Sequence, residues 1–250
     1  MDSIIARELR LRYQPVAVIF TDDRPEGALQ FREGTWGCAV AMFSAASKAR
    51  TAVFDRTTTG CTGGIAGLCF GSGYEQVPGG IEHFLSTGRG EGYPEGEAYK
   101  KTPELARTFV DELPITDIPQ KYVVFKPLSE VDPERETPVL VSFYAAPDQI
   151  SALVVLANYG RPGGDNVIVP FSSACSTLCL IPYAESLKPR PRAVIGITDV
   201  TARPYVDPDI LAFTVPWAMF EQMEADAPGS FLEKKSWKKV RERIPDPGLD

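Results

Sequence analysis

The stretch Thr51–Gly71, TAVFDRTTTGCTGGIAGLCFG, indicates how the chain is organised. It has the pattern of a short apolar strand, a turn rich in threonine and glycine, and a small-residue helix that begins at Cys61. A second stretch, Asn166–Tyr183, NVIVPFSSACSTLCLIPY, repeats the order of strand, small polar turn and cysteine, here Cys175. Two cysteines on equivalent turns predict one shared site.

The segments around these stretches predict alternating strands and helices. Apolar runs predict strands at 15–20, 121–128, 138–145, 192–199 and 210–215, and apolar spacing predicts helices at 3–12, 39–49, 147–160 and from 217. The halves 13–120 and 121–225 resemble each other in pattern. We therefore expect a single α+β or α/β domain, built by internal duplication, with mixed sheets and short helices. Its equivalent turns would face a common cleft, and 226–250 would form a charged helix or tail.

Composition indicates a globular protein. The chain has 250 residues, 44% of them hydrophobic, and a net charge of -7, which argues against a broad nucleic-acid interface. No apolar run approaches the ~20 residues of a membrane helix, so no membrane association is expected. The N-terminus carries charges where a signal peptide would have an apolar core. We expect a cytoplasmic protein.

The cysteine and histidine content narrows the chemistry. Five cysteines in a cytoplasmic chain favour buried thiols, metal ligands or redox groups over disulfides, and the single histidine, His83, excludes a histidine-rich metal site. Cys38, Cys61 and Cys175 are expected at helix starts, where backbone N–H groups and the helix dipole lower a thiol pKa. Soft thiolates without histidine favour an iron–sulfur cluster, and zinc next. Cys69 and Cys179 lie within apolar helical sequence and are expected in the core.

The long segment 71–119 is rich in glycine and proline. Such a segment can be a cover for a substrate or a plain surface excursion. It carries Tyr74 and His83, which are expected to be exposed loop residues rather than proton donors.

Several motifs resemble those of the domain-of-unknown-function 169 family, found chiefly in anaerobic bacteria and archaea. They are Gly37-Cys38, the turn 60–64 with its following helix, the strand YVVFKPL, and the segment 173–176, and the resemblance spans roughly residues 5–225. It implies a common ligand or catalytic role for Cys38, Cys61 and Cys175. The family's last turn, often preceded by a further cysteine, corresponds to 198–203. That cysteine is absent here, which leaves Asp199, a small molecule or an open iron as the fourth ligand.

The main hypothesis is that the chain is a [4Fe–4S] protein. Two kinds of activity are compatible with it, that of a redox enzyme and that of a Lewis-acid enzyme. Cys38, Cys61, Cys175 and Asp199 are the predicted metal ligands, and the residues expected around the cofactor or an anionic substrate are Gly60, Gly63, Gly64, Ser173, Lys126 and Arg203. One alternative is a metal-free enzyme with Cys61 as nucleophile and Cys175 as resolving thiol. Another is a non-catalytic protein that binds a small ligand or cofactor. The expected partners are a small molecule or a redox protein, and the halves can pair within one chain or in a homodimer.

Overall fold

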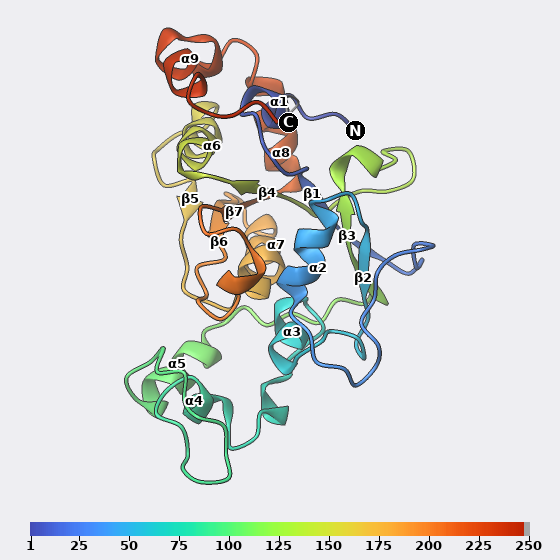
Figure 1. Ribbon diagram of the computed structural model, residues 1–250, viewed down its shortest axis with the longest axis vertical. Helices are drawn as coiled ribbons and strands as arrows, with labels where there is room; N and C mark the ends of the chain where they lie inside the picture. The colour runs from blue at the N-terminus through green and yellow to red at the C-terminus, as the bar shows by residue number, and fades with distance from the viewer. Residues whose placement is uncertain (248–250) are drawn as a thin grey trace.

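The computed structural model describes residues 1–247 and is organised around a seven-stranded sheet in the order β2-β3-β1-β4-β7-β6-β5 (Figure 1). Neighbouring strands are antiparallel, except that β5 and β6 run parallel. The strands are β1 (Val16–Thr21), β2 (Ala52–Phe54), β3 (Tyr122–Pro127), β4 (Leu140–Ala145), β5 (Val167–Ile168), β6 (Ala193–Gly196) and β7 (Leu211–Pro216).

The central strands are apolar on both faces. In β1, Val16 and Val18 belong to one hydrophobic cluster, whereas Ala17 and Ile19 belong to another. Successive side chains of a strand point to opposite faces, so a strand that is apolar throughout needs cover on both sides. The sheet is therefore the middle layer of three.

Each face of the sheet has its own set of helices (Figure 1). The upper face in Figure 1 is covered by α1 (Ile4–Glu8), α6 (Pro147–Tyr159), α8 (Trp217–Asp226) and α9 (Lys235–Arg241). The opposite face is covered by α2 (Ala39–Ala46), α3 (Thr62–Gly67), the π-helix η3 (Ser176–Leu180) and α7 (Ile181–Ser186). Short 3-10 turns complete the body at η2 (Leu128–Glu130), η4 (Arg203–Tyr205) and η5 (Phe231–Glu233).

A lobe lies below the second face, at the bottom of Figure 1. It comprises η1 (Tyr74–Gln76), α4 (Ile81–Phe84) and α5 (Pro103–Asp111), all inserted between α3 and β3. Its two ends meet, because the Gly71 amide donates to the Thr116 carbonyl at 3.0 Å and the Ile118 amide to the Cys69 carbonyl at 2.9 Å. The glycine- and proline-rich segment is thus one excursion with a closed base.

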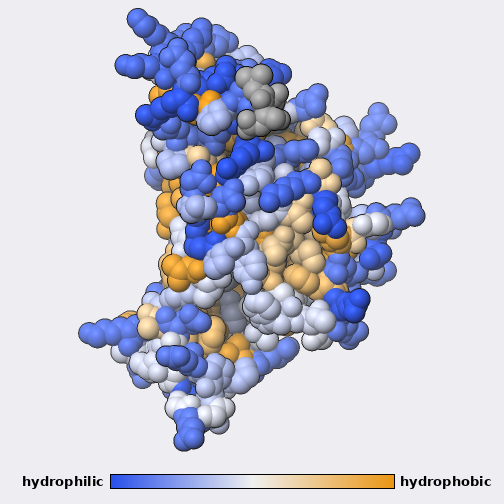
Figure 2. Space-filling view, viewed as in Figure 1, coloured by the Kyte–Doolittle hydropathy of each residue, from blue (hydrophilic) through white to orange (hydrophobic). Residues whose placement is uncertain are grey.

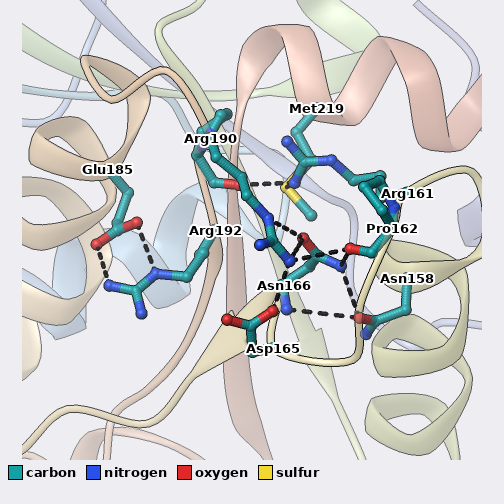
Figure 3. Close-up of polar contacts among 10 residues, drawn as sticks. Asn158, Arg161, Pro162, Asp165, Asn166, Glu185, Arg190, Arg192 and Met219 are labelled. Carbon is teal, nitrogen blue, oxygen red and sulfur yellow. Dashed lines mark hydrogen bonds and ion pairs between the residues drawn. The ribbon is translucent and has the colours of Figure 1, made fainter.

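The edge strand β5 has only two residues, and side chains on both sides of it supply further anchorage (Figure 3). Asn166 Nδ2 donates to Asn158 Oδ1 at 2.8 Å, and the Asn166 carbonyl accepts from the Ala193 amide at 2.9 Å. Arg190 donates to the Pro162 carbonyl at 2.9 Å, and Arg161 to the Pro191 carbonyl at 2.6 Å. These bonds fix the segment that leads into η3.

The expected mixed α/β single domain is confirmed, and the predicted strands and helices occur where the patterns placed them, within a few residues. The expected internal duplication is not shown. The helices that follow β1 and β4, namely α2 and α6, lie on opposite faces of the sheet, and β7 lies between β4 and β6 without a counterpart in the first half. Of the expected C-terminal helix or tail, α9 is present, and residues 248–250 lie outside the described part of the chain.

No helix within residues 1–247 is long and apolar enough to cross a membrane.

Candidate functional site

A pocket of about 410 Å³ lies between the lobe and the body, on the side of the sheet covered by α2, α3 and η3. In Figure 2, apolar side chains are visible where the lower lobe meets the body. Cys38, Cys61, Cys175 and Asp199 all line this pocket, together with Gly63. The structure therefore brings together the four predicted metal ligands, which come from four separate segments of the sequence.

The turns of Cys38 and Cys61 are joined through their backbones. Cys38 is the N-cap of α2, Cys61 is the N-cap of α3, and the Gly37 amide donates to the Gly60 carbonyl at 2.9 Å. Gly60 has a φ of +83°, and a Cβ at this position would lie 2.5 Å from the Gly37 oxygen. Glycine is therefore required here both by the backbone conformation and by the close approach.

Cys175 reaches the same pocket from the helical segment that continues into η3. Its Sγ lies 3.6 Å from the Gly63 carbonyl oxygen and 3.4 Å from Ser173 Oγ. A Cβ on Gly67 would lie 2.3 Å from this sulfur, so a glycine in α3 makes the contact possible. Directly after Cys175 the helix widens into a π-helix, a feature that occurs frequently at functional sites.

The remaining predicted glycines and Ser173 lie around these sulfurs. A Cβ on Gly63 would lie 4.0 Å from Cys61 Sγ, whereas one on Gly64 would lie 2.6 Å from the Thr59 carbonyl oxygen. Gly63 thus leaves space beside the thiol, and Gly64 allows the turn to pack on α3. Ser173 lines the pocket and also contacts Ser176 Oγ at 2.8 Å.

The thiols have raised pKa values, which corrects the expectation that helix starts would lower them. Burial raises the pKa of Cys38 and of Cys61, and the backbone N–H groups of α2 and α3 oppose this only in part. Burial, with the nearby Cys61, Cys38 and Asp199, raises the pKa of Cys175 to about 12. Without a bound cation, the three cysteines are therefore neutral thiols at pH 7.

Asp199 connects three parts of the pocket wall. Its carboxylate accepts hydrogen bonds from the Thr201 amide at 3.1 Å and from Thr201 Oγ1 at 2.8 Å. It also accepts one at 3.3 Å from the amide of Ala174, the residue before Cys175. The Tyr99 hydroxyl, from the lobe, lies 3.5 Å from the same carboxylate. Asp199 thereby positions the start of the Cys175 helix relative to the lobe.

The backbone leading to Asp199 is strained. Ile197 has a φ of +59°, a left-handed conformation that is uncommon for a β-branched residue. Its amide donates to Thr177 Oγ1 at 3.1 Å, and Thr177 Oγ1 donates to the Ala174 carbonyl at 2.9 Å. A residue of the π-helix thus holds the strained turn in place.

Tyr74 belongs to the pocket, contrary to the expectation of an exposed loop residue. It is half-buried, it lines the cavity, and its hydroxyl lies close to Ser176 and Cys175. Burial and the proximity of Cys175 raise its pKa, so it is a neutral hydroxyl at pH 7 that can donate a hydrogen bond. His83 is also half-buried, on α4, but it does not line the pocket.

Lys126 and Arg203 lie outside the pocket lining. Lys126 Nζ lies 2.8 and 2.6 Å from the two carboxylate oxygens of Glu136. The Arg203 guanidinium donates to the carbonyl oxygens of Ile210 at 2.5 Å and Pro208 at 2.9 Å. Their contacts are those of side chains that hold loops in place.

Sequence reasoning missed the wall that the lobe contributes. The lobe contributes three aromatic side chains and one carboxylate residue to the lining, namely Phe84, Tyr99, Phe109 and Glu97. The adjoining body segment before η3 adds Phe171 and the buried Ser172. The glycine and proline content of 71–119 was the sole sequence signal that this segment could cover a substrate. The individual wall residues could not be predicted, because side chains on irregular loops have no periodicity that assigns them to a site.

Two cysteines lie apart from the pocket lining. Cys69 and Cys179 are fully buried, as expected of core residues, with their sulfurs 3.8 Å apart. Within residues 1–247, no three or more cysteine, histidine or acidic side chains converge closely enough to hold a single metal ion. The three pocket cysteines line a common cavity, but their sulfurs do not converge on one position for a single metal ion.

A family model described as uncharacterised ArCR, COG2043 (DUF169) matches residues 4–226 of the chain. No curated protein and no solved structure shows significant similarity to it.

Proposed function

The chain belongs to the DUF169 family, and we propose that its pocket binds a [4Fe–4S] cluster through Cys38, Cys61 and Cys175, beside a small molecule enclosed by the lobe. When bound, such a cluster supplies electron transfer or, at an iron without a cysteine ligand, Lewis-acid chemistry.

The observation that carries the proposal is the charge of the pocket lining. Three thiols line one cavity in which the ionisable neighbours include the carboxylates of Asp199 and Glu97, while no lysine, arginine or histidine of residues 1–247 lines it. Thiolates placed together without a cation repel one another, and the raised pKa values reflect this repulsion together with burial. A cationic metal centre removes that penalty, because thiol ligands lose their protons on binding.

The donor set fits a cluster better than a single ion. Thiolate sulfur is the ligand that iron–sulfur clusters use, and the three sulfurs line a common space without converging on one point. Asp199 is already bound by the amides of Thr201 and Ala174. We therefore assign it to positioning the Cys175 segment and leave the fourth ligand place to a small molecule.

The chain's own residues would support such a centre. The Tyr74 hydroxyl and Ser173 Oγ lie at the same end of the pocket as Cys175 and can donate hydrogen bonds to a negatively charged sulfur. The aromatic residues of the lobe limit the access of water. A metal-free nucleophile is the weaker alternative, because burial keeps Cys61 protonated at pH 7.

The test is iron and acid-labile sulfide content, with an absorption spectrum, after purification without oxygen. About four iron and four sulfide per chain are expected, with broad absorption near roughly 400 nm. Cys61→Ala is expected to lose this content, whereas Cys179→Ala, which removes a fully buried thiol outside the pocket lining, is expected to keep it.

Circular dichroism of both variants provides the control for folding. Folded wild-type protein without iron would overturn the proposal. Equal loss of iron in the two folded variants would overturn the ligand assignment.

A further inference from the structure

We infer that the small molecule taken up by this pocket is an arylalkylamine, an aromatic ring with an amine on a short alkyl chain, bound as its ammonium form. The inference deepens the proposed function, because it names the class of ligand for the same pocket. It stands on the chemistry of the lobe wall and on one unpartnered hydroxyl.

Glu97 adds to the pocket lining a negative charge that no cationic side chain of residues 1–247 pairs with. Glu97 lines the cavity from the lobe, and its carboxylate makes no hydrogen bond or ion pair with any residue of 1–247. Asp199, the other carboxylate of the lining, is held by Thr201 and Ala174 and stays in place as a second negative charge. An organic anion would meet both charges without a basic residue in the lining to offset them, whereas an ammonium group would be attracted.

The wall beside Glu97 is aromatic. Phe109 and Phe171 have ring centroids 5.1 Å apart, and Tyr99 lies 5.9 Å from Phe171. The Lys100 ammonium, which is not part of the lining, lies 4.7 Å from the Phe109 centroid and 5.0 Å from that of Phe171. These rings, which are tilted or edge-on to one another, therefore already hold one ammonium group by their faces, and aromatic side chains also favour an aromatic ligand.

Ser172 supplies a polar anchor. The residue is 2% exposed, it lines the pocket, and its Oγ has no hydrogen-bond partner among residues 1–247. A buried hydroxyl without a partner carries a free-energy cost that a ligand atom can remove. Because this atom is closed off from solvent in the structure, a polar ligand atom could reach it only after the Ser172 side chain turns to another rotamer, at the body side of the cavity.

The size of the cavity fits this class. A volume of about 410 Å³ is within the range of pockets that take small organic molecules. An aromatic body filling the space between the lobe rings and the thiols leaves its ammonium group facing Glu97.

The experiment is calorimetric titration of the full-length protein with three ligands of similar shape: 2-phenylethylamine, 2-phenylethanol and phenylacetate. At pH 7 these are a cation, a neutral molecule and an anion. The amine is expected to bind about tenfold more tightly than the alcohol, and phenylacetate more weakly than either. Tighter binding of phenylacetate, or no binding of the amine, would overturn the inference.

Two matched variants locate the effect. Glu97→Gln is expected to remove the preference for the amine over the alcohol, whereas Glu95→Gln, an exposed carboxylate of the same loop outside the lining, is expected to leave it unchanged. Phe171→Ala is expected to weaken the binding of the amine and of the alcohol to the same extent. A preference that persists in folded Glu97→Gln would overturn the assignment of Glu97.

The same titration on Cys61→Ala separates this inference from the cluster. Iron-free Cys61→Ala that still prefers the amine would support the ligand class independently of the cluster. Folded wild-type protein that is iron-free and prefers the amine would overturn the cluster alone. Iron-loaded wild-type protein that does not bind the amine would overturn the ligand class alone.

Discussion

The Gly37 amide donates a hydrogen bond to the Gly60 carbonyl at 2.9 Å, and this single bond places the N-caps of α2 and α3 side by side. Cys38 and Cys61 directly follow these two glycines in the sequence. The proximity of the two thiols is therefore set by backbone geometry, before either side chain contributes.

Gly60→Ala is expected to destabilise the protein by a few kcal/mol, because the new Cβ would lie 2.5 Å from the Gly37 oxygen on a residue with a φ of +83°. Gly27→Ala is the matched control, since its φ is +68° but nothing lies within 4 Å of the added carbon. Urea unfolding measures both. Equal decreases in the free energy of unfolding for the two variants would show that backbone conformation, and not the contact with Gly37, makes glycine necessary at position 60.

Thr177→Val is expected to cost about 1–3 kcal/mol, because it leaves the buried Ile197 amide without its acceptor. Thr108→Val, on the exposed side of α5, is expected to change the free energy of unfolding by less than about 0.5 kcal/mol. Chemical denaturation measures both changes. A neutral Thr177→Val would mean that the strained turn at Ile197 does not depend on the π-helix.

The metal-free protein is expected to lose stability in alkali. Burial and neighbouring charges raise the pKa of Cys175 from 9.0 to about 12, so folding favours the protonated thiol. The stabilisation is complete below pH 9 and is lost as the pH rises towards 12, by roughly 1.4 kcal/mol per pH unit for this one group.

Cys175→Ala should therefore show a shallower loss of stability than the wild type between about pH 9 and 11. Unfolding followed by circular dichroism at a series of pH values gives the two slopes. Cys69→Ala, a fully buried thiol outside the pocket lining, provides a second comparison. Parallel curves for wild type and Cys175→Ala would contradict the raised pKa.

Glu185 is expected to make the protein sensitive to acid. Its side chain is 3% exposed, and burial acts to raise its pKa. Hydrogen bonds from Arg192 (Figure 3) and from Lys188 outweigh burial and lower the pKa. The contribution to stability is present above the ordinary carboxyl pKa and is lost as the pH falls through the lowered value.

Glu185→Gln is expected to cost about 1–3 kcal/mol at pH 7 and less at low pH. Asp165→Asn is the control, because this carboxylate pairs with Arg190 at the same edge of the sheet but its side chain is 75% exposed. It should cost less than about 1 kcal/mol. A loss for Glu185→Gln that does not shrink on acidification would contradict the low pKa.

Much of the fold follows from local patterns. The strands are nearly continuous apolar runs and the helices α2 and α6 are rich in apolar residues, and their positions match the expectation closely. The convergence of Cys38, Cys61, Cys175 and Asp199 on one pocket also agrees with the expected common site.

Other features depend on tertiary structure and could not be read from the sequence. Nothing local specifies that α2 and α6 cover opposite faces of the sheet, because both are apolar on the side that packs. The thiol pKa values follow from burial, which outweighs the helix-start effect on which the prediction rested. The aromatic wall lies on loops whose sequence signals only that a turn is present.

The insertion of the lobe between α3 and β3 also bears on the order of folding. Strand β3 pairs with β1 and β2, so Val16 must meet Pro127 and Ala52 must meet Phe125 across the whole intervening excursion. Such non-local pairing makes folding slow, since the entropy of closing a long loop is lost before the contacts form. A nascent chain that ends before β3 therefore lacks the strand that joins β1 to β2, and it also lacks Cys175 and Asp199 of the pocket.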